Sequence, residues 1–252
     1  MIDPICFHIG SRPVYWFGLL MASAFMAAML HWTLLGRKTG RDTSIAGDLA
    51  LWLMIGGVAG ARVAYVIANF SYFKNAPMEI IRVDQGGLVF YGGLIGATIT
   101  LHVLSKRYHE SFLSLADFTV TALPLGHALG RIGCFLNGCC HGRLVDYPSC
   151  STFWLSRYPV QLFEAAFNLI VYLLLLRVFI RKTPHNPPGL LLALYLIIYP
   201  IGRFMLEFLR GDDRLQAGFL NAAQLISLGL IAAGLIMWTL LRRHERNLHR
   251  KA

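Results

Sequence analysis

Residues 130–142 read Gly-Arg-Ile-Gly-Cys-Phe-Leu-Asn-Gly-Cys-Cys-His-Gly and bring an arginine, an asparagine, a histidine and three cysteines between strongly apolar stretches. Ionisable side chains are costly at membrane depth. Irregular, glycine-rich backbone is tolerated there only where protein or a water-filled cavity covers it. The segment therefore indicates a functional site at a membrane boundary.

A second group of polar residues follows a helical spacing. Tyr195, Tyr199, Arg203, Glu207 and Arg210 recur at intervals of four, four, four and three, which places them on one helical face. One interpretation is a salt bridge that neutralises both charges. The other is that Glu207 orients one arginine while another binds an anion. The planar fork of a guanidinium suits phosphate, to which it donates two parallel hydrogen bonds.

Two more arginines lie at apolar segments: Arg131, and Arg62 in the sequence Gly-Ala-Arg-Val-Ala-Tyr. A single arginine at such a place can extend to the head groups as a structural device. Three of them near one membrane face, in different helices, favour a phosphate-binding site. In a bilayer the most abundant anionic ligand is a phospholipid head group.

Glycines and isolated polar residues mark the third and fourth apolar segments. Gly92, Gly93 and Gly96 predict either close helix packing or close approach of a ligand to the backbone. Asp117 is expected to make an interhelical hydrogen bond, and His127 is either another such residue or a base. A proline, at 124, is expected to kink the fourth segment before residue 130.

The cysteines allow several chemistries. Cys134, Cys139, Cys140 and Cys150 cluster in one loop, with His141 beside them. The loop lacks a Cys-x-x-Cys pair, and adjacent cysteines rarely ligate one ion, so we expect no metal. A disulfide joining Cys150 to Cys139 or Cys140 is favoured on the oxidising side of a membrane. A thiol–disulfide enzyme would need a low-pKa thiol, which nothing in the sequence establishes.

The rest of the chain must hold these residues in a membrane. Its 252 residues are 56% hydrophobic and 14% charged, whereas soluble domains carry about 25% charged residues. Apolar segments of about 20 residues, enough to cross a bilayer, recur throughout. They predict an all-α integral membrane protein with one polytopic domain, 1–252, and seven helices: Val14–Leu35, Ala46–Phe70, Leu88–Leu104, Phe112–Leu129, Pro159–Ile180, Gly189–Phe208 and Leu220–Leu241.

The distribution of basic residues predicts the orientation. If the chain crosses the membrane seven times, one set of loops and the tail 242–251 lie on the same side. They carry most of the Lys and Arg residues that lie outside the apolar segments. Such a bias marks the cytoplasmic side, so the N-terminus is expected outside and the C-terminus in the cytoplasm. The loop 130–158 then lies on the outer side. The net charge of +10 indicates that basic residues bind anionic lipids and anchor the chain, so no nucleic-acid partner is expected.

In this order the residues resemble the prolipoprotein diacylglyceryl transferase family over nearly the whole chain. The family motif, about Gly-Arg-x-Gly-Asn-Phe-x-Asn-x-Glu-x-x-Gly, is matched by residues 130–142 at its arginine, its phenylalanine, its second asparagine and all three of its glycines. Three departures concern the chemistry. Tyr91 stands where the family has histidine, Cys134 replaces the first asparagine, and Cys139 replaces the glutamate. The first helix also has Trp16-Phe17-Gly18 in place of Trp-Tyr-Gly. The flanking matches are Gly60–Tyr65, Gly92–Gly96, Asp117, Pro124, Arg157–Glu164, Gly202–Arg210 and Gln224–Ser227.

The resemblance implies a multi-pass protein of the bacterial inner membrane with its active site toward the periplasm. It implies phosphatidylglycerol as donor, the lipobox cysteine in a prolipoprotein signal peptide as acceptor, contact with membrane lipids, and no cofactor. The catalytic candidates are Arg131, Arg203, Tyr91 and His127. The candidates for substrate binding are Arg62, Gly92, Gly93, Gly96, Gly133, Asn137, Gly142, Glu207 and Arg210.

Some alternatives stay open from the sequence. The base that takes the thiol proton is Tyr91, His127 or His141, or no side chain at all, since a few per cent of a thiol is already ionised. A related transferase with another acceptor, or a lipid- or anion-binding carrier, would also need several arginines.

Overall fold

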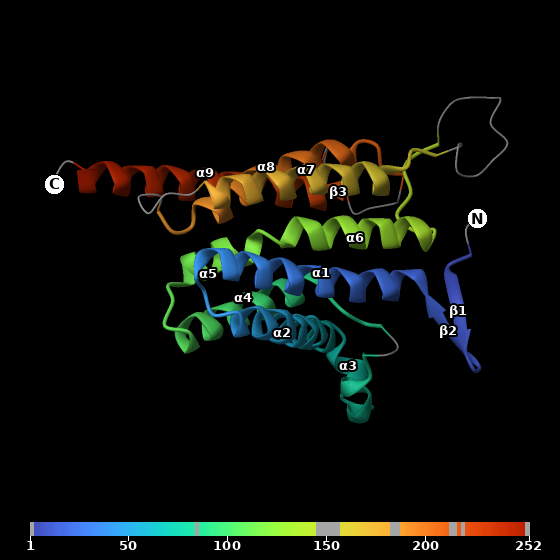
Figure 1. Cartoon of the computed structure of the whole chain (residues 1–252). Helices are drawn as coiled ribbons and strands as arrows, with labels where there is room; N and C mark the ends of the chain where they lie inside the picture. The colour runs from blue at the N-terminus through green and yellow to red at the C-terminus, as the bar shows by residue number, and fades with distance from the viewer. Residues whose placement is uncertain are drawn as a thin grey trace. The chain divides into compact units, whose positions relative to one another are not determined.

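The protein is an assembly of long helices with two short hairpins (Figure 1). A computed structural model describes residues 3–83, 86–144, 157–181, 187–211, 216–217 and 220–249. The helices are α1 (Trp16–Thr39), α2 (Ser44–Ala68), α3 (Phe70–Phe73), the 3₁₀ turn η1 (Pro77–Ile81), α4 (Phe90–Arg107), α5 (Phe112–Val120), α6 (Leu123–Leu136), α7 (Val160–Ile180), α8 (Leu190–Glu207) and α9 (Ala222–His249). The strands are β1 (Ile5–Ile9), β2 (Arg12–Tyr15), β3 (Gln216–Ala217) and β4 (Leu220–Asn221). The all-α class is confirmed.

The described residues contain 6 helical segments long and apolar enough to cross a bilayer. These are 16–39, 44–68, 112–136, 160–180, 190–207 and 222–243. Large apolar side chains on them stay exposed, such as Ile67 at 69% and Ile170 at 65%, as a lipid-facing surface requires. Helix α4, with His102, Lys106 and Arg107 in its second half, is not one of the six. The chain is a multi-pass membrane protein, whereas seven spans and the orientation of the termini stay predictions.

The chain divides into two compact units. The first comprises residues 1–28 and 117–252, and the second comprises residues 29–116. Each boundary falls inside a helix, α1 or α5. The expectation of one polytopic domain stays a prediction.

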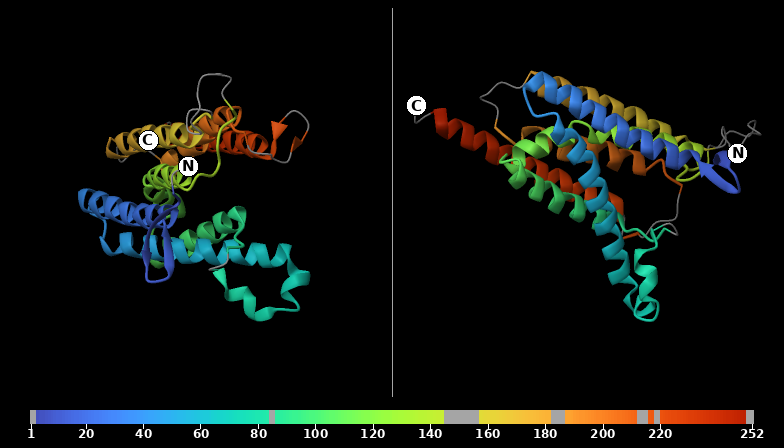
Figure 2. Two further views of the ribbon diagram at one scale, coloured as in Figure 1. Left: turned by 90° about the vertical axis from the view of Figure 1, so that its right-hand side faces the viewer. Right: turned by 60° about the horizontal axis from the view of Figure 1, so that its bottom comes forward.

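In the first unit, four helices pack in chain order. α6 packs against α7, α7 against α8, and α8 against α9 (Figure 2). Gly234 lets α9 approach α8 closely, because a Cβ there would lie 2.8 Å from Cγ1 of Ile197. The apolar core at the α7–α8 contact consists of Val120, Val171, Leu175, Leu190, Leu191 and Tyr195.

Asp117 fixes the beginning of α8. Its carboxylate accepts hydrogen bonds from the backbone N–H groups of Gly189 at 2.9 Å and Leu192 at 3.0 Å. The first N–H groups of a helix have no intrahelical partner and favour negative charge, so this buried carboxylate satisfies both requirements. The expected interhelical hydrogen bond is confirmed. The kink is confirmed too, since α5 ends at Val120 and Pro124 lies in the first turn of α6.

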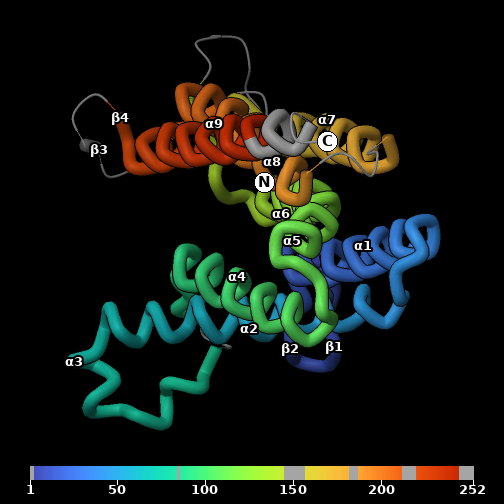
Figure 3. The backbone as a smooth tube through the Cα atoms, turned by 90° about the vertical axis from the view of Figure 1, so that its left-hand side faces the viewer, coloured from blue at the N-terminus to red at the C-terminus, as the bar shows by residue number. Residues whose placement is uncertain are grey.

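In the second unit, α2 and α4 pack backbone against backbone (Figure 3). A Cβ on Gly60 would lie 2.8 Å from Cα of Gly96, and one on Gly93 would lie 3.2 Å from the carbonyl oxygen of Gly57. A side chain on Gly60 would therefore clash with the backbone of α4, and one on Gly93 would require Gly57 to shift by a few tenths of an ångström. The close-packing interpretation of the glycines that open α4 is confirmed.

This contact makes a stability prediction. Gly60→Ala should lower the melting temperature of the detergent-purified protein, because overpacking costs about 1–3 kcal/mol and the clashing atoms belong to backbone. Gly47→Ala is the matched control in the same helix, since a Cβ there meets nothing within 4 Å. It should keep or slightly raise the melting temperature. Equal melting temperatures for the two variants would contradict the packing described.

Candidate functional site

The site begins with a polar stripe on α6. His127, Arg131 and Cys134 follow one another at intervals of four and three residues and so share one face. Another face of α6 packs on the first turns of α1, where a Cβ on Gly133 would lie 3.2 Å from Cδ2 of Phe17. The structure thus shows Gly133 at a helix–helix contact.

Arg131 is held by a buried carboxylate of α7. Its Nε lies 3.0 Å from Oε1 of Glu164, whose side chain is 2% exposed, whereas that of Arg131 is 24% exposed. Sequence reasoning placed Glu164 among the family matches but missed it as a site residue. The signal was present, because a carboxylate in the middle of an apolar helix is a functional candidate by default.

Aromatic residues of α8 surround His127. Nδ1 of His127 lies 3.1 Å from the hydroxyl of Tyr195, and its ring centroid lies 5.1 Å from that of Tyr199. The two tyrosine rings stack on each other at 5.3 Å with 13° between their planes. His127 is therefore part of a packed aromatic cluster, and its role as a base stays a prediction.

Further along α8, the carboxylate of Glu207 lies close to two arginines. Its Oε2 lies 2.5 Å from Nη1 of Arg203 and 3.9 Å from Nε of Arg210. Its Oε1 accepts a hydrogen bond of 2.8 Å from Nδ2 of Asn221, which sequence reasoning missed. The salt bridge between Arg203 and Glu207, one of the two interpretations of this face, is confirmed, and the same carboxylate also lies near Arg210.

The charges of this site do not cancel. The guanidinium groups of Arg131, Arg203 and Arg210 face two carboxylates, Glu164 and Glu207, so positive charge is in excess. The side chain of Arg210 is only 2% exposed, but those of Arg131 and Arg203 are 24% and 11% exposed. Both of these arginines, with Glu164, act electrostatically on Tyr199, which lies among them. Arg131 and Arg203 are thus the reachable cations of this site, and their contact with an anionic ligand stays a prediction.

The loop after α6 is tied to the ends of α7 and α8. The backbone of Gly142 donates to the carbonyl of Tyr158 at 3.1 Å, and Gly211 donates to His141 at 3.2 Å. Gln161 Nε2 donates to the carbonyl of Cys139 at 2.7 Å and lies 3.3 Å from Nδ1 of His141. The loop is therefore anchored on three sides. Gly142 also has a steric role, because a Cβ there would lie 2.8 Å from Cγ2 of Val160.

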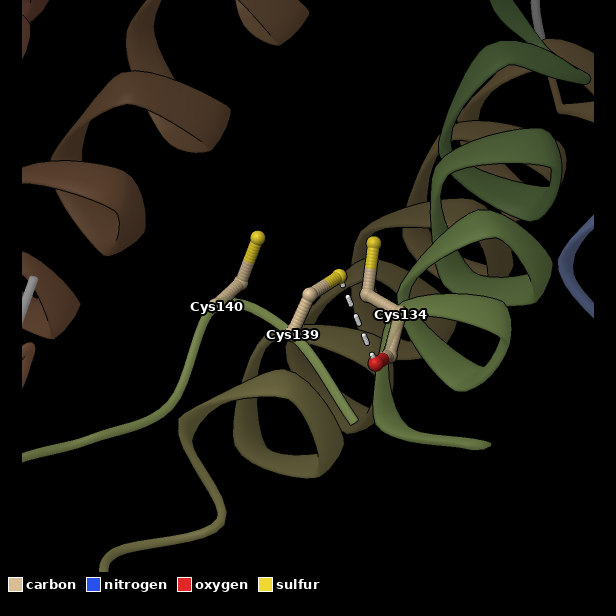
Figure 4. A group of neighbouring side chains, drawn as sticks. All are labelled: Cys134, Cys139 and Cys140. Atoms are coloured by element: carbon tan, nitrogen blue, oxygen red, sulfur yellow. Dashed lines mark hydrogen bonds between the residues drawn. The ribbon is translucent and has the colours of Figure 1, made fainter. Parts of the chain in front are cut away.

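This loop brings three cysteines together. The Sγ atoms of Cys134, Cys139 and Cys140 lie within 4.8 Å of one another (Figure 4). Asn137 caps α6 between them, with its N–H 2.9 Å from the carbonyl of Gly133. The three thiols, like that of Cys6, are free. The proposed partner Cys150 lies outside the described residues, so the disulfide stays a prediction.

The two loop thiols differ in acidity. Hydrogen bonds from Cys134 and from Arg210 lower the pKa of Cys140 below its ordinary value. Burial raises the pKa of Cys139. Cys140 is therefore the more acidic thiol of this pair.

The remaining candidates belong to the second unit. Tyr91 is half-exposed beside Phe90 in the first turn of α4, near Gly92, Gly93 and Gly96. Arg62 is 9% exposed and donates four hydrogen bonds to backbone carbonyls, those of Glu79, Ile80, Gly86 and Gly87. Arg62 thus holds both η1 and the segment that follows it. A contact with substrate from Tyr91, Arg62 or these glycines stays a prediction.

The fold and the site together define an integral membrane protein whose apolar helices enclose an arginine-rich, anion-compatible centre. A sequence model of prolipoprotein diacylglyceryl transferase matches residues 4–240. The chain is 35% identical to phosphatidylglycerol–prolipoprotein diacylglyceryl transferase of Pseudoalteromonas translucida over 94% of this chain and 93% of that one. It is 34% identical to the enzyme of the same name from Aeromonas salmonicida, covering 97% and 92%. For that of Nostoc the identity is 32%, covering 95% and 90%. The chain belongs to the prolipoprotein diacylglyceryl transferase family.

The pair formed by Arg131 and Glu164 makes a prediction that does not depend on activity. Removing one partner of a buried ion pair leaves an uncompensated charge and costs about 3–5 kcal/mol. Arg131→Ala and Glu164→Ala should therefore each lower the free energy of unfolding, while the double variant should lose less than the sum. A double-mutant cycle in detergent should give a coupling energy of about 1–3 kcal/mol.

The pair formed by Arg107 and Asp48 is the control for this cycle. Its atoms lie 4.0 Å apart, and the arginine side chain is 65% exposed. Exposed pairs contribute about 0–1 kcal/mol, so its coupling energy should be close to zero. Equal coupling energies in the two cycles would mean that Glu164 does not hold Arg131 in the way described.

Proposed function

We propose that the protein transfers the diacylglyceryl group of phosphatidylglycerol to the lipobox cysteine thiol of a prolipoprotein. The carbon–oxygen bond to phosphate breaks, a carbon–sulfur bond forms, and the thiol proton is lost, so the products are a thioether and glycerol 1-phosphate. Family membership supports the reaction. Proteins named phosphatidylglycerol–prolipoprotein diacylglyceryl transferase are 32–35% identical to this chain over nearly their whole length. The observation that carries it is the pair of reachable arginines, each held by a buried carboxylate.

The leaving group explains why the arginines matter. Negative charge grows on the phosphate oxygens as the carbon–oxygen bond breaks. Fixed cations in a site that excludes water stabilise that charge without reorganising at the moment of reaction. Glu164 and Glu207 fix the two guanidinium groups before substrate binds, which is the preorganisation required. Gly92, Gly93 and Gly96 pack against α2, and their proposed second role is to let the lipid head group approach the backbone of α4.

The acceptor thiol must lose a proton. A free thiol has a pKa near 8.5, so a small fraction is ionised at neutral pH and a base increases it. Tyr91 occupies the position of the family's histidine and is assigned to the thiol or the phosphate. His127 and His141 are the other nitrogen bases. We assign the site to the periplasmic face of the bacterial inner membrane, with a signal peptide as the second ligand and no cofactor.

The first prediction concerns the two reachable arginines. Arg131→Ala and Arg203→Ala should each reduce transfer from labelled phosphatidylglycerol to a lipobox peptide by about 10²–10³-fold, the effect of losing one preorganised charge contact. Arg131→Lys and Arg203→Lys should also lose most activity, since an ammonium does not reproduce the fork.

Arg12→Ala, on the exposed strand β2, is the control and should keep the wild-type rate. Release of glycerol phosphate should depend on the peptide, whereas a binding or carrier protein would release none. A wild-type rate in either alanine variant removes that arginine from the mechanism.

The second prediction concerns Tyr91. Tyr91→Phe should lose activity at all pH values, because the hydroxyl is its only polar group. Tyr91→His should restore activity that rises with pH through the imidazole pKa near 6.5, since only the neutral ring accepts a proton. The rate of peptide modification between pH 5 and pH 9 measures both variants, with Phe90→Leu as a neighbouring control. Full activity in Tyr91→Phe would direct the search for the base to His127 or His141.

A further inference from the structure

The cluster of Cys134, Cys139 and Cys140 has no role in the reaction proposed above. The first cysteine ends the polar stripe of α6, and the other two lie in the anchored loop that follows. Their Sγ atoms all lie within 4.8 Å of one another. In a tetrahedral site with Zn–S bonds of about 2.3 Å, neighbouring sulfurs lie about 3.8 Å apart. The cluster therefore needs to contract by no more than about 1 Å to surround such an ion.

The objection that adjacent cysteines rarely share an ion does not apply to this loop. Cys140 has a φ of 63°, in the left-handed region, and Gly138 before the pair has a φ of 68°. These angles turn the chain so that both adjacent sulfurs lie on the side of Cys134, as Figure 4 shows. A left-handed conformation is unfavourable for a residue with a Cβ and persists where its surroundings hold it. This backbone geometry removes one of the two reasons for expecting no metal, the adjacency of Cys139 and Cys140, whereas the other, the lack of a Cys-x-x-Cys pair, remains.

The surroundings hold the cluster in place. The N–H of Cys139 donates to the carbonyl of Cys134 at 3.1 Å, and its own carbonyl accepts from Gln161 at 2.7 Å. The carbonyl of His141, one residue beyond the pair, accepts from Gly211 at 3.2 Å. All three sulfurs are thus carried by backbone that is fixed on both sides. A metal site needs such support to keep its geometry.

The thiolate ligands and the charges around the cluster indicate which kind of metal ion would bind. Thiolates are soft ligands that select Zn²⁺ and Cu⁺, whereas Mg²⁺ and Ca²⁺ require oxygen ligands. Three thiolates around a divalent ion leave one negative charge. Arg210, within hydrogen-bonding reach of Cys140, and Arg131, on the same face of α6 as Cys134, offset that charge.

We propose that Cys134, Cys139 and Cys140 form a three-thiolate site for a thiophilic metal ion, with Zn²⁺ or Cu⁺ as the occupant. The proposal goes beyond the transfer reaction and does not depend on it. Binding requires the three thiols to lose their protons, and no oxidation takes place.

The test is metal binding by the full-length, tag-free protein, purified in detergent with reductant and freed of metal by a chelator. Titration with Zn²⁺, and separately with Cu⁺, is followed by elemental analysis and competition with a chromophoric chelator. We expect one ion per chain. Cys134→Ser, Cys139→Ser and Cys140→Ser should each weaken binding by at least about 100-fold, more than the loss of an outer-shell contact does.

Cys6→Ser is the matched control, because Cys6 is also a free thiol and lies in β1, outside the cluster. It should bind as tightly as the wild type. The proposal is overturned if the wild type binds no stoichiometric Zn²⁺ or Cu⁺. It is also overturned if Cys6→Ser loses binding, or if the three cluster variants keep it.

A measurement on the wild-type chain covers the case in which a cluster variant fails to fold. Alkylation followed by peptide mass spectrometry should show that bound metal protects Cys134, Cys139 and Cys140, while Cys6 reacts at an unchanged rate. Equal protection of Cys6, or a disulfide within the cluster in the metal-loaded protein, would refute the site. Because neither readout uses catalysis, loss of the proposed transferase activity would leave this result intact.

Discussion

The buried carboxylates of α7 and α8 are the constraint on which the site depends. An arginine inside a bundle of apolar helices is costly unless a charge of opposite sign accompanies it. Glu164 and Glu207 provide that charge, with exposed fractions of 1% and 5% for the whole residues. Because each is rigidly held in a long helix, each also fixes the direction of a guanidinium group. The same two interactions therefore stabilise the bundle and prepare a place for an anion.

The loop after α6 extends this arrangement beyond the helices. Backbone hydrogen bonds join it to the residues that precede α7 and to those that follow α8. The chain ends of three helices thus meet at one place, and the polar side chains that they carry meet with them. The backbone N–H and C=O groups of a loop have no partners within a helix, so they must form hydrogen bonds elsewhere. A short connection between packed helices would not bring three helix ends together in this way. Here the partners are neighbouring loops and the amide of Gln161.

The sequence predicted much of the fold, because apolar segments long enough to cross a bilayer give a strong signal. It also predicted the helical face of α8, the close packing of the glycines that open α4, and the interhelical hydrogen bond of Asp117. It did not predict that Glu164 would pair with Arg131 or that Asn221 would reach Glu207, since both pairs are distant in the chain. It also did not predict that Arg62 would donate hydrogen bonds to backbone carbonyls, or that Cys140 would adopt a left-handed conformation. Such contacts depend on loop geometry, which hydrophobic periodicity does not encode.

The glycine-faced contact of α2 and α4 has a consequence for the thermodynamics of assembly. In a bilayer, helices form before they associate, so the backbone is already ordered when the two helices meet. Ordinary interfaces then lose rotamer freedom, which costs up to about 2 kcal/mol for each long side chain. Gly60 and Gly96 have no rotamers to lose. The two helices therefore associate with almost no loss of side-chain entropy at these positions, where their backbones are in van der Waals contact.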